Sequence, residues 1–206
     1  TLPTPAEIRS FLADQSSNKR EKKIDELLAR PAYAAWWTTK FCDVTGNNER
    51  TMPEQEFRVH YYEQWYRWVY KRINENMPYD KLVAGMVLAT SKLPGESYTE
   101  YTHDMTSYLR KKDPHNFADR ETMPHYWSRN NMRTPNEKAL SFSYAFLGVR
   151  LQCAECHKHP FDQWSQEDFK HFTAFFNRVV FGVASEDRDV ERKMVDTLGL
   201  KGLKGT

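Results

Sequence analysis

The chain has 206 residues, with 30 basic and 28 acidic side chains and a formal net charge of +2. This length predicts one domain with room for a small appendage. The near balance of charges excludes the strong positive field that nucleic-acid binding needs, so we expect no nucleic-acid partner. No apolar run approaches the ~18 residues of a membrane span, and none is predicted in this chain.

The first thirty residues are predicted to form two short helices. Thr4-Pro5-Ala6-Glu7 has the pattern of a capping box with proline at the first helical position, which predicts a helix from residue 5. A second helix is predicted over about residues 19–29. Its helical spacing predicts that Ile24, Leu27 and Leu28 form the buried face.

Three further helices are predicted before residue 90. Pro31 starts one that ends near Gly46, and the longest covers about residues 54–77. Aromatic residues recur along the long helix at helical spacing and predict a core face. These residues are Phe57, Tyr61, Trp65 and Trp68. Pro78-Tyr79-Asp80 breaks this pattern and starts the next helix.

Between Ser91 and Thr134 the periodicity disappears, so this stretch is predicted to be a long loop segment. Segments of this kind inside compact domains are usually functional or disordered. The stretch is rich in side chains that ligate metals. These are His103, Met105, His115, Met123, His125 and Met132.

The last third of the chain is predicted to contain three helices. Pro135, capped by Thr134, opens one that should be buried because apolar residues cover most of its circumference. Ser165 caps a second, and a weak third is predicted near 188–198, with the last residues loosely held. The predicted fold is therefore all-α, an irregular domain of about six to eight helices with one long loop segment.

The sequence Cys153-Ala154-Glu155-Cys156-His157 is the pattern for covalent attachment of a c-type haem. Cys153 and Cys156 would form thioethers to the two vinyl groups, and His157 would be the proximal iron ligand. Two of only three cysteines fall at this spacing, which makes chance a poor explanation. The predicted cofactor is haem c, held in an irregular all-α haem domain.

Two other uses of these thiols stay open. A disulfide or redox dithiol usually occurs in a thioredoxin-like βαβ setting, which this sequence lacks. Zinc is the stronger alternative, because the two thiols with His157 or His159 supply three ligands. A closed zinc site needs a fourth ligand, and Cys42 is the one remaining thiol. We otherwise expect Cys42 to be buried as a small hydrophobic residue.

The run FLGVRLQCAECHKHPFDQWSQEDFKHFTAFFNRV, residues 146–179, closely resembles the planctomycete cytochrome c-like domain family of the second type (the PSCyt/PSD group). Its members have no established activity. With similar pieces upstream, the resemblance implies a haem domain over residues 1–180 and a loosely ordered extension over 181–206 that leads toward a second domain. It also implies a periplasmic or otherwise extracytoplasmic location. Because the chain begins at Thr1, we expect it to be a piece of a longer protein.

The resemblance marks further candidate cofactor-binding residues beside the two cysteines and His157. They are His159, Phe161 and Trp164. Two residues span at most ~7 Å, so His159 cannot reach the opposite face of a haem from His157. We expect His159 to hydrogen-bond nearby, to a propionate or to a carboxylate such as Asp162, or simply to pack.

The sixth iron position has several candidates. Met132 and His125 come first, and an open site is an equal alternative. Histidine and methionine are both ordinary haem ligands, and methionine would raise the reduction potential. Met123, His103 and His60 follow as weaker candidates.

Three functions follow from these observations. Electron transfer to an adjoining domain or a redox partner protein is favoured. The second is a haem redox enzyme with an open distal site, peroxidase-like or oxidising a substrate such as a polysaccharide, in which His125 with Arg129 or Arg133 assists. The third is a haem-free binding module in which zinc or a disulfide staples residues 146–164. The sequence leaves the enzyme question, the substrate and the oligomeric state open.

Overall fold

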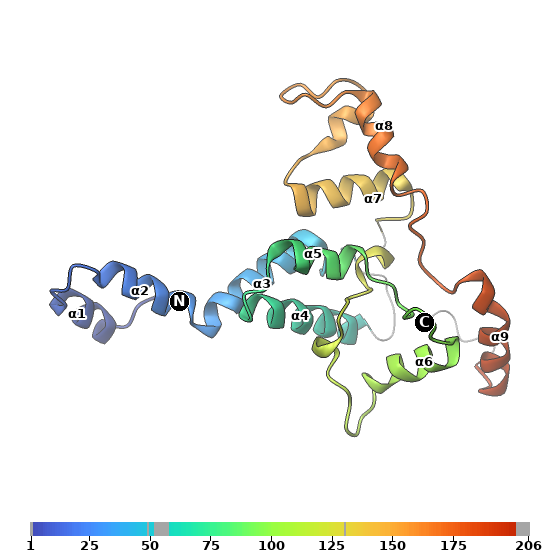
Figure 1. The fold of residues 1–206 in the computed structure, drawn as a ribbon, viewed down its shortest axis with the longest axis horizontal. Coiled ribbons are helices and arrows are strands. Elements are labelled where there is room, and N and C mark those ends of the chain that lie inside the picture. The colour runs from blue at the N-terminus through green and yellow to red at the C-terminus, as the bar shows by residue number, and fades with distance from the viewer. Residues whose placement is uncertain (1, 49, 52–57, 130, 201–206) are drawn as a thin grey trace.

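The computed structural model describes residues 2–48, 50–51, 58–129 and 131–200 (Figure 1). Within these ranges the regular structure consists of helices, with no strand. The all-α prediction is therefore confirmed. None of the helices in the described ranges is both long and apolar enough to cross a membrane.

The nine α-helices of the described ranges follow the predicted order closely. They are α1 (Pro5–Ala13), α2 (Lys19–Leu28), α3 (Pro31–Thr45), α4 (Arg58–Asn74), α5 (Tyr79–Val87), α6 (Tyr98–Ser107), α7 (Pro135–Phe142), α8 (Gln166–Ala174) and α9 (Arg188–Thr197). Short turns connect them: η1 (Phe117–Asp119), η2 (Tyr126–Ser128), the π-turn η3 (Ser143–Leu147), η4 (Leu151–Glu155) and η5 (Ser185–Asp187).

The helix boundaries are set by local signals in the sequence. Capping boxes open α1 at Thr4, α7 at Thr134 and α8 at Ser165, each with the hydroxyl accepting a backbone N–H three residues on. Gly46 ends α3 with φ of +93°, a conformation that glycine adopts without strain. The predicted starts of these helices and the predicted end of α3 near Gly46 are confirmed, whereas the helix that begins at Pro135 ends at Phe142, before the motif.

The body of the molecule is built around α4. Trp65 and Trp68, the second half of the predicted aromatic stripe, are 0% and 1% exposed and pack among residues of α3, α5 and η2. Phe57, at the start of the stripe, lies outside the described residues. The Trp68 indole N–H donates to the backbone oxygen of Arg120, at 3.0 Å, which ties η1 to the helix. A large aromatic core therefore holds the loop between α6 and α7 in place.

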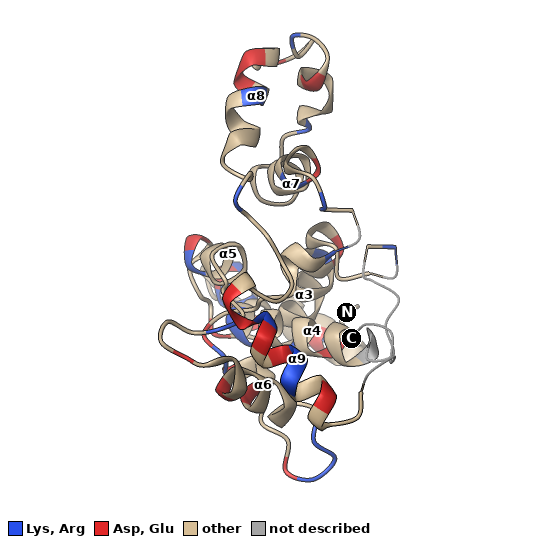
Figure 2. Ribbon diagram, turned by 90° about the vertical axis from the view of Figure 1, so that its right-hand side faces the viewer, with Lys and Arg blue, Asp and Glu red and all other residues tan. Residues whose placement is uncertain are grey.

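A smaller lobe consists of α7, η3, η4 and α8, and it stands away from α3–α5 in two perpendicular views (Figures 1 and 2). Its own core is small, with Leu151, Ala154 and Phe169 buried. Phe146 and Phe176, from η3 and the end of α8, belong instead to the main core and join the lobe to the body.

The first two helices form a hairpin that projects from the body, and neither contains a buried residue (Figure 1). The prediction that Ile24, Leu27 and Leu28 are buried is wrong, since they are 55%, 44% and 49% exposed. The apolar stripe of α2 exists as predicted. The described chain supplies no layer that covers it.

Part of the predicted loop segment is helical, because α6 occupies residues 98–107. The C-terminal helix predicted near 188–198 is confirmed as α9, which packs against α6. Lys92 and Asp187 form an ion pair of 2.5 Å that fastens η5 to the segment before α6. The expectation of loosely held last residues concerns positions 201–206, which lie outside the described residues.

Candidate functional site

Cys153 lies on the 3₁₀ turn η4, and Cys156 is the C-cap residue that follows the turn. Side chains three residues apart lie over one another in a 3₁₀ turn, which brings the two cysteines to about the same side. Both thiols are exposed and free. Leu151 and Ala154, also three residues apart, are 0% exposed and anchor the other side of η4 in the lobe core. The turn therefore holds both thiols outward on a fixed support.

His157 follows directly and is oriented by its own backbone neighbours. Its N–H donates to the carbonyl oxygen of Cys153 at 3.1 Å, which continues the turn. The ring Nδ1 lies 2.7 Å from the carbonyl oxygen of Lys158. A carbonyl can only accept, so the neutral ring carries its proton on Nδ1 and keeps the Nε2 lone pair for a metal. Ligating histidines usually have this arrangement.

His159 fastens the loop that follows the motif. Its ring Nε2 donates to the carbonyl oxygen of Arg150 at 3.1 Å, and its Nδ1 accepts the N–H of Phe161 at 3.3 Å. Its backbone N–H donates to the carbonyl oxygen of Trp164 at 2.8 Å. Both ring nitrogens are thus used inside the loop, and neither contacts Asp162. The binding of His159 to a propionate stays a prediction.

Several large apolar side chains are exposed on the lobe that carries the thiols. Phe161, at the outer tip of the lobe, is 93% exposed, while Trp164 is half-buried with its ring 6.2 Å from that of Phe172. Tyr144 and Leu147 of η3 are 44% and 50% exposed, so the prediction that this helix is buried all round is wrong for its last turn. The lobe is too thin to cover both of its sides. Exposed apolar surface on the same lobe as two free thiols is compatible with a large flat apolar cofactor.

The first-ranked distal ligands are not brought to the motif. The His125 ring stacks on Phe117, with centroids 5.1 Å apart, and its Nε2 lies 3.1 Å from the Gln64 side-chain oxygen. Met132 is 0% exposed in the main core. The motif and its loop instead form the outer end of the lobe, away from the body (Figure 1). In this arrangement His125 and Met132 act as core residues.

The remaining distal candidates also lie on other elements. Met123 is in the main core, His103 is on α6 beside Arg110, and His60 is exposed on α4. Arg129, proposed to assist His125 in peroxide chemistry, is 4% exposed with its guanidinium 5.1 Å from the Tyr126 ring. That pair therefore lies in the body and does not face the thiols.

Burial of His125 predicts acid sensitivity. Desolvation, with a smaller contribution from the Arg120 charge, lowers its pKa from 6.5 to about 3. Between these values the unfolded chain binds a proton that the folded chain does not, so stability falls as the pH falls, by about 1.4 kcal/mol per pH unit. We expect urea unfolding at pH 6.5 and 4.5 to show this loss in the native chain and a smaller loss in His125→Asn. Equal losses in both would contradict the assignment.

The zinc alternative finds no fourth ligand in Cys42. The Cys42 thiol is buried in the main core, where burial raises its pKa to about 11, and it accepts a 3.6 Å contact from the Asn47 amide. Among the described residues no group of three or more His, Cys, Asp or Glu side chains is arranged to hold a metal. Cys42 is buried, as the sequence predicts.

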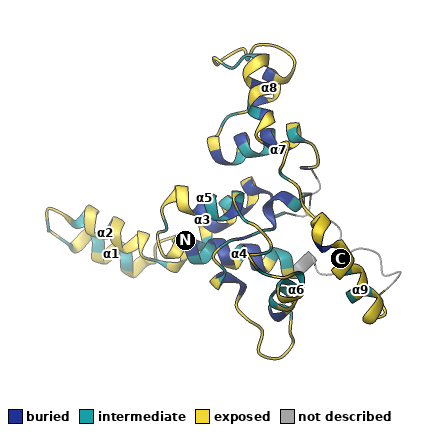
Figure 3. Ribbon diagram, turned by 45° about the vertical axis from the view of Figure 1, so that its right-hand side comes forward, coloured by how far each residue is buried: buried dark blue, intermediate teal, exposed yellow. Residues whose placement is uncertain are grey.

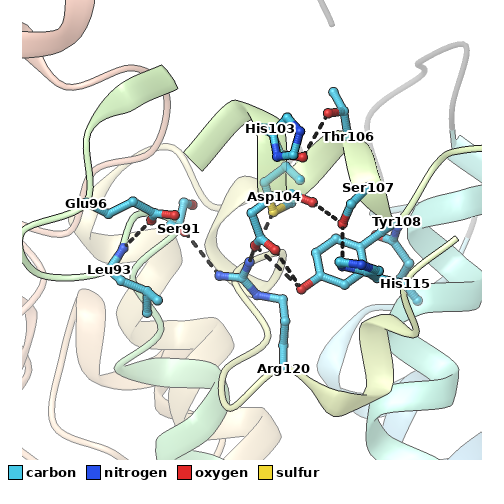
Figure 4. A network of polar contacts seen from close by, with 12 residues as sticks. Ser91, Leu93, Glu96, His103, Asp104, Thr106, Ser107, Tyr108, His115 and Arg120 are labelled. Carbon is cyan, nitrogen blue, oxygen red and sulfur yellow. Dashed lines mark hydrogen bonds and ion pairs between the residues drawn. The ribbon is translucent and has the colours of Figure 1, made fainter. Parts of the chain in front are cut away.

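A polar network that the sequence did not reveal surrounds Arg120 (Figure 4). Arg120 pairs with Asp104 at 2.6 Å and donates to the Ser91 carbonyl oxygen. Ser107 lies 3.0 Å from the His115 Nδ1, but its hydroxyl donates to the Asp104 carbonyl oxygen and is 1% exposed. A serine so buried is no nucleophile, and the network serves to fasten α6 to η1.

The comparison with protein families decides the membership of the chain. A model named PSCyt2, described as "Protein of unknown function (DUF1549)", matches residues 1–180. The chain belongs to the PSCyt2 family. This confirms the resemblance to the planctomycete cytochrome c-like domain family of the second type. The search of curated proteins and the search of solved structures found no match.

The PSCyt2 match covers the body and the whole lobe with the motif, and it ends before η5 and α9. Its description assigns no activity, so membership does not identify a cofactor. The geometry of η4 and the loop after it is therefore the evidence on which the function of this PSCyt2 chain is argued.

Proposed function

We propose that this chain is an extracytoplasmic mono-haem c-type cytochrome domain that passes electrons to an adjoining domain or a partner protein. Covalent haem c is held through Cys153 and Cys156, with His157 as the proximal ligand. The location rests on the family resemblance. The single observation that carries the proposal is the pairing of two free, exposed thiols three residues apart with a histidine whose Nδ1 lies against the Lys158 carbonyl oxygen.

The residues of the chain perform the attachment and the positioning. Each thiol adds across one vinyl group: its sulfur bonds to one vinyl carbon and its proton goes to the other, so no oxidant is consumed. The Lys158 carbonyl oxygen, 2.7 Å from Nδ1, would orient the His157 ring and leave Nε2 as the atom that binds the iron. When bound, haem supplies reversible one-electron redox chemistry at its iron.

Exposed apolar side chains on the same lobe support the same cofactor. Phe161, Tyr144 and Leu147 of this lobe present rings and methyl groups to solvent. Covering such surface with a macrocycle removes it from water at roughly 25 cal/mol per Å². The loop clamped by His159 keeps Phe161 beside the motif.

The attachment is tested on protein made in a host with c-type maturation. We expect its mass to exceed that of the polypeptide by one haem and its colour to remain with the protein after acid-acetone treatment. The reduced protein is expected to have the optical spectrum of haem c. A mass equal to the bare polypeptide would refute the proposal.

One observation favours a second function, a haem redox enzyme with an open distal site. His125 and Met132 are packed in the main core, and the described residues bring neither to the motif. An open position would allow peroxide or another small oxidant to bind. Low-temperature electron paramagnetic resonance of the oxidised protein separates the two functions, since a low-spin signal supports electron transfer and a high-spin signal supports the enzyme.

A further inference from the structure

Most residues of the α1–α2 hairpin are exposed (Figure 3), and large apolar side chains are among them. Six aliphatic side chains on it are strongly exposed. They are Leu2 (92%), Ile8 (46%), Leu12 (66%), Ile24 (55%), Leu27 (44%) and Leu28 (49%). Exposed aliphatic residues scattered singly need no explanation, but five on two adjacent helices, with Leu2 just before the first, indicate an interaction surface.

The two helices enclose an open groove on this hairpin. Its volume is 310 Å³, and its apolar lining comes mainly from Ile8, Phe11, Leu12 and Leu27. Glu7, Lys23 and Arg30 lie at its edges. A groove with an apolar floor and charged edges of both signs is suited to accept apolar side chains from another helix.

The hairpin lacks an internal source of stability. Its helices have 9 and 10 residues, and helices this short are marginal without tertiary packing. Arg30 forms ion pairs with Glu7 and Glu26, and Lys19 donates to the Asp14 carbonyl oxygen at 2.9 Å. Partly exposed ion pairs contribute only about 0–1 kcal/mol each. A covering layer is therefore needed to supply the missing burial.

The first turns of α3, which directly follow the hairpin in the chain, also expose apolar side chains. Tyr33, Trp36 and Trp37 are 38%, 60% and 49% exposed, and aromatic rings are enriched at protein interfaces. With the six aliphatic side chains they present apolar area on the order of 800 Å², which is what one partner contributes to a standard interface. The patch is thus large enough for a stable dimer.

The charges of the hairpin allow a second copy to bind. Residues 2–30 carry six basic side chains (Arg9, Lys19, Arg20, Lys22, Lys23, Arg30) and five acidic ones (Glu7, Asp14, Glu21, Asp25, Glu26). The net charge of +1 gives little repulsion between copies, and the mixed signs permit cross-pairs. The same balance offers little attraction to an anionic lipid surface.

We propose that this chain forms a homodimer in which the α1–α2 hairpins of two subunits pack face to face. A two-fold axis pairs the same surface of both subunits, and two helical hairpins related in this way make a four-helix arrangement. The groove of each hairpin takes apolar side chains of the other. The lobe with Cys153 and Cys156 projects from a different side of the body and stays free (Figure 1).

Sedimentation velocity from about 1 to about 100 µM, the range of moderate dimer affinities, tests the proposal. We expect the native chain to approach twice its 24.4 kDa mass as the concentration rises. Leu27→Glu places a charge in the groove and should raise the dimer dissociation constant at least about tenfold. The matched control is Leu88→Glu, at the 74% exposed leucine that caps the C-terminus of α5, which should leave the dissociation constant unchanged.

A monomeric native chain at every concentration would overturn the proposal, as would Leu27→Glu chains that associate as tightly as the native ones. A monomer that instead binds anionic phospholipid vesicles would assign the surface to a membrane and overturn it too. If Leu27→Glu does not fold, hydrogen exchange of the native chain decides. Backbone amides of α1 and α2 must gain protection with concentration, and a constant exchange rate contradicts the dimer.

Discussion

We expect the Cys153→Ala/Cys156→Ala variant to lose all covalently bound haem while keeping its helical fold. Both thiols are exposed and make no packing contact in either core cluster, so their loss leaves η4 held by Leu151 and Ala154. Haem-free forms of the native chain and the variant should differ in unfolding free energy by less than about 0.5 kcal/mol. Acid-acetone extraction and intact mass measure the loss of haem directly.

The third cysteine provides the matched control for this loss. Cys42→Ala removes a thiol from the main core and should leave the pigment attached, since Cys42 lies away from the motif. His157→Ala should keep the pigment through both thioethers and change the absorption spectrum, because the proximal ligand is lost. Pigment that stays bound to the double variant would show that haem is attached elsewhere. It would contradict the assignment of Cys153 and Cys156 as the attachment residues.

The helix boundaries were readable from the sequence because their signals are local. Thr134 and Glu137, or Ser165 and Asp168, sit three residues apart and complete their hydrogen bonds within one turn. The same kind of signal also marked α6, where Ser97 and Glu100 form a capping box. That helix went unpredicted because it has little aliphatic periodicity and packs through tyrosines, Met105 and the Arg120 network.

The burial of an apolar helix face could not be predicted from local sequence signals. A helical stripe such as Leu27 and Leu28 fixes which face of α2 is apolar, but whether another layer covers that face depends on how distant elements pack. Trp65 and Trp68 also form an apolar stripe, but α3 and α5 pack against it and bury it in the core. An apolar stripe at helical spacing is therefore exposed on α2 and buried on α4 of the same chain.

The same difference between local signals and long-range packing applies to the candidate site. The motif and the proposed proximal role of His157 depend on neighbours in sequence, and the local geometry is compatible with that proposal. The choice of a distal ligand depends on distances across the fold, and no spacing in the sequence reveals that His125 packs against Phe117 in the body. The hydrogen bond between His159 and the Arg150 carbonyl oxygen likewise depends on how the chain folds, and no spacing in the sequence predicts it.

We expect Trp68→Ala to destabilise the fold by about 3–5 kcal/mol, a large share of the ~5–15 kcal/mol that stabilises a typical domain. The indole is 1% exposed, and the Arg72 guanidinium lies 4.0 Å above its ring. Truncation leaves a cavity at the centre of the body and removes this cation–π contact. Urea unfolding should show a lower midpoint with an unchanged slope. Leu88→Ala, at the exposed residue that caps the C-terminus of α5, should change the free energy by less than about 0.5 kcal/mol.

Gly85 makes the test of this core more specific. A β-carbon added there would lie 2.9 Å from the edge of the Trp68 ring, too close for a rigid indole to accept without a shift. Gly85→Ala should therefore destabilise the native chain, although alanine favours helix by about 1 kcal/mol over glycine. In the Trp68→Ala background the clash is gone, so the same substitution should become neutral or stabilising. Additive effects of the two substitutions would mean that α5 and α4 do not meet at this contact.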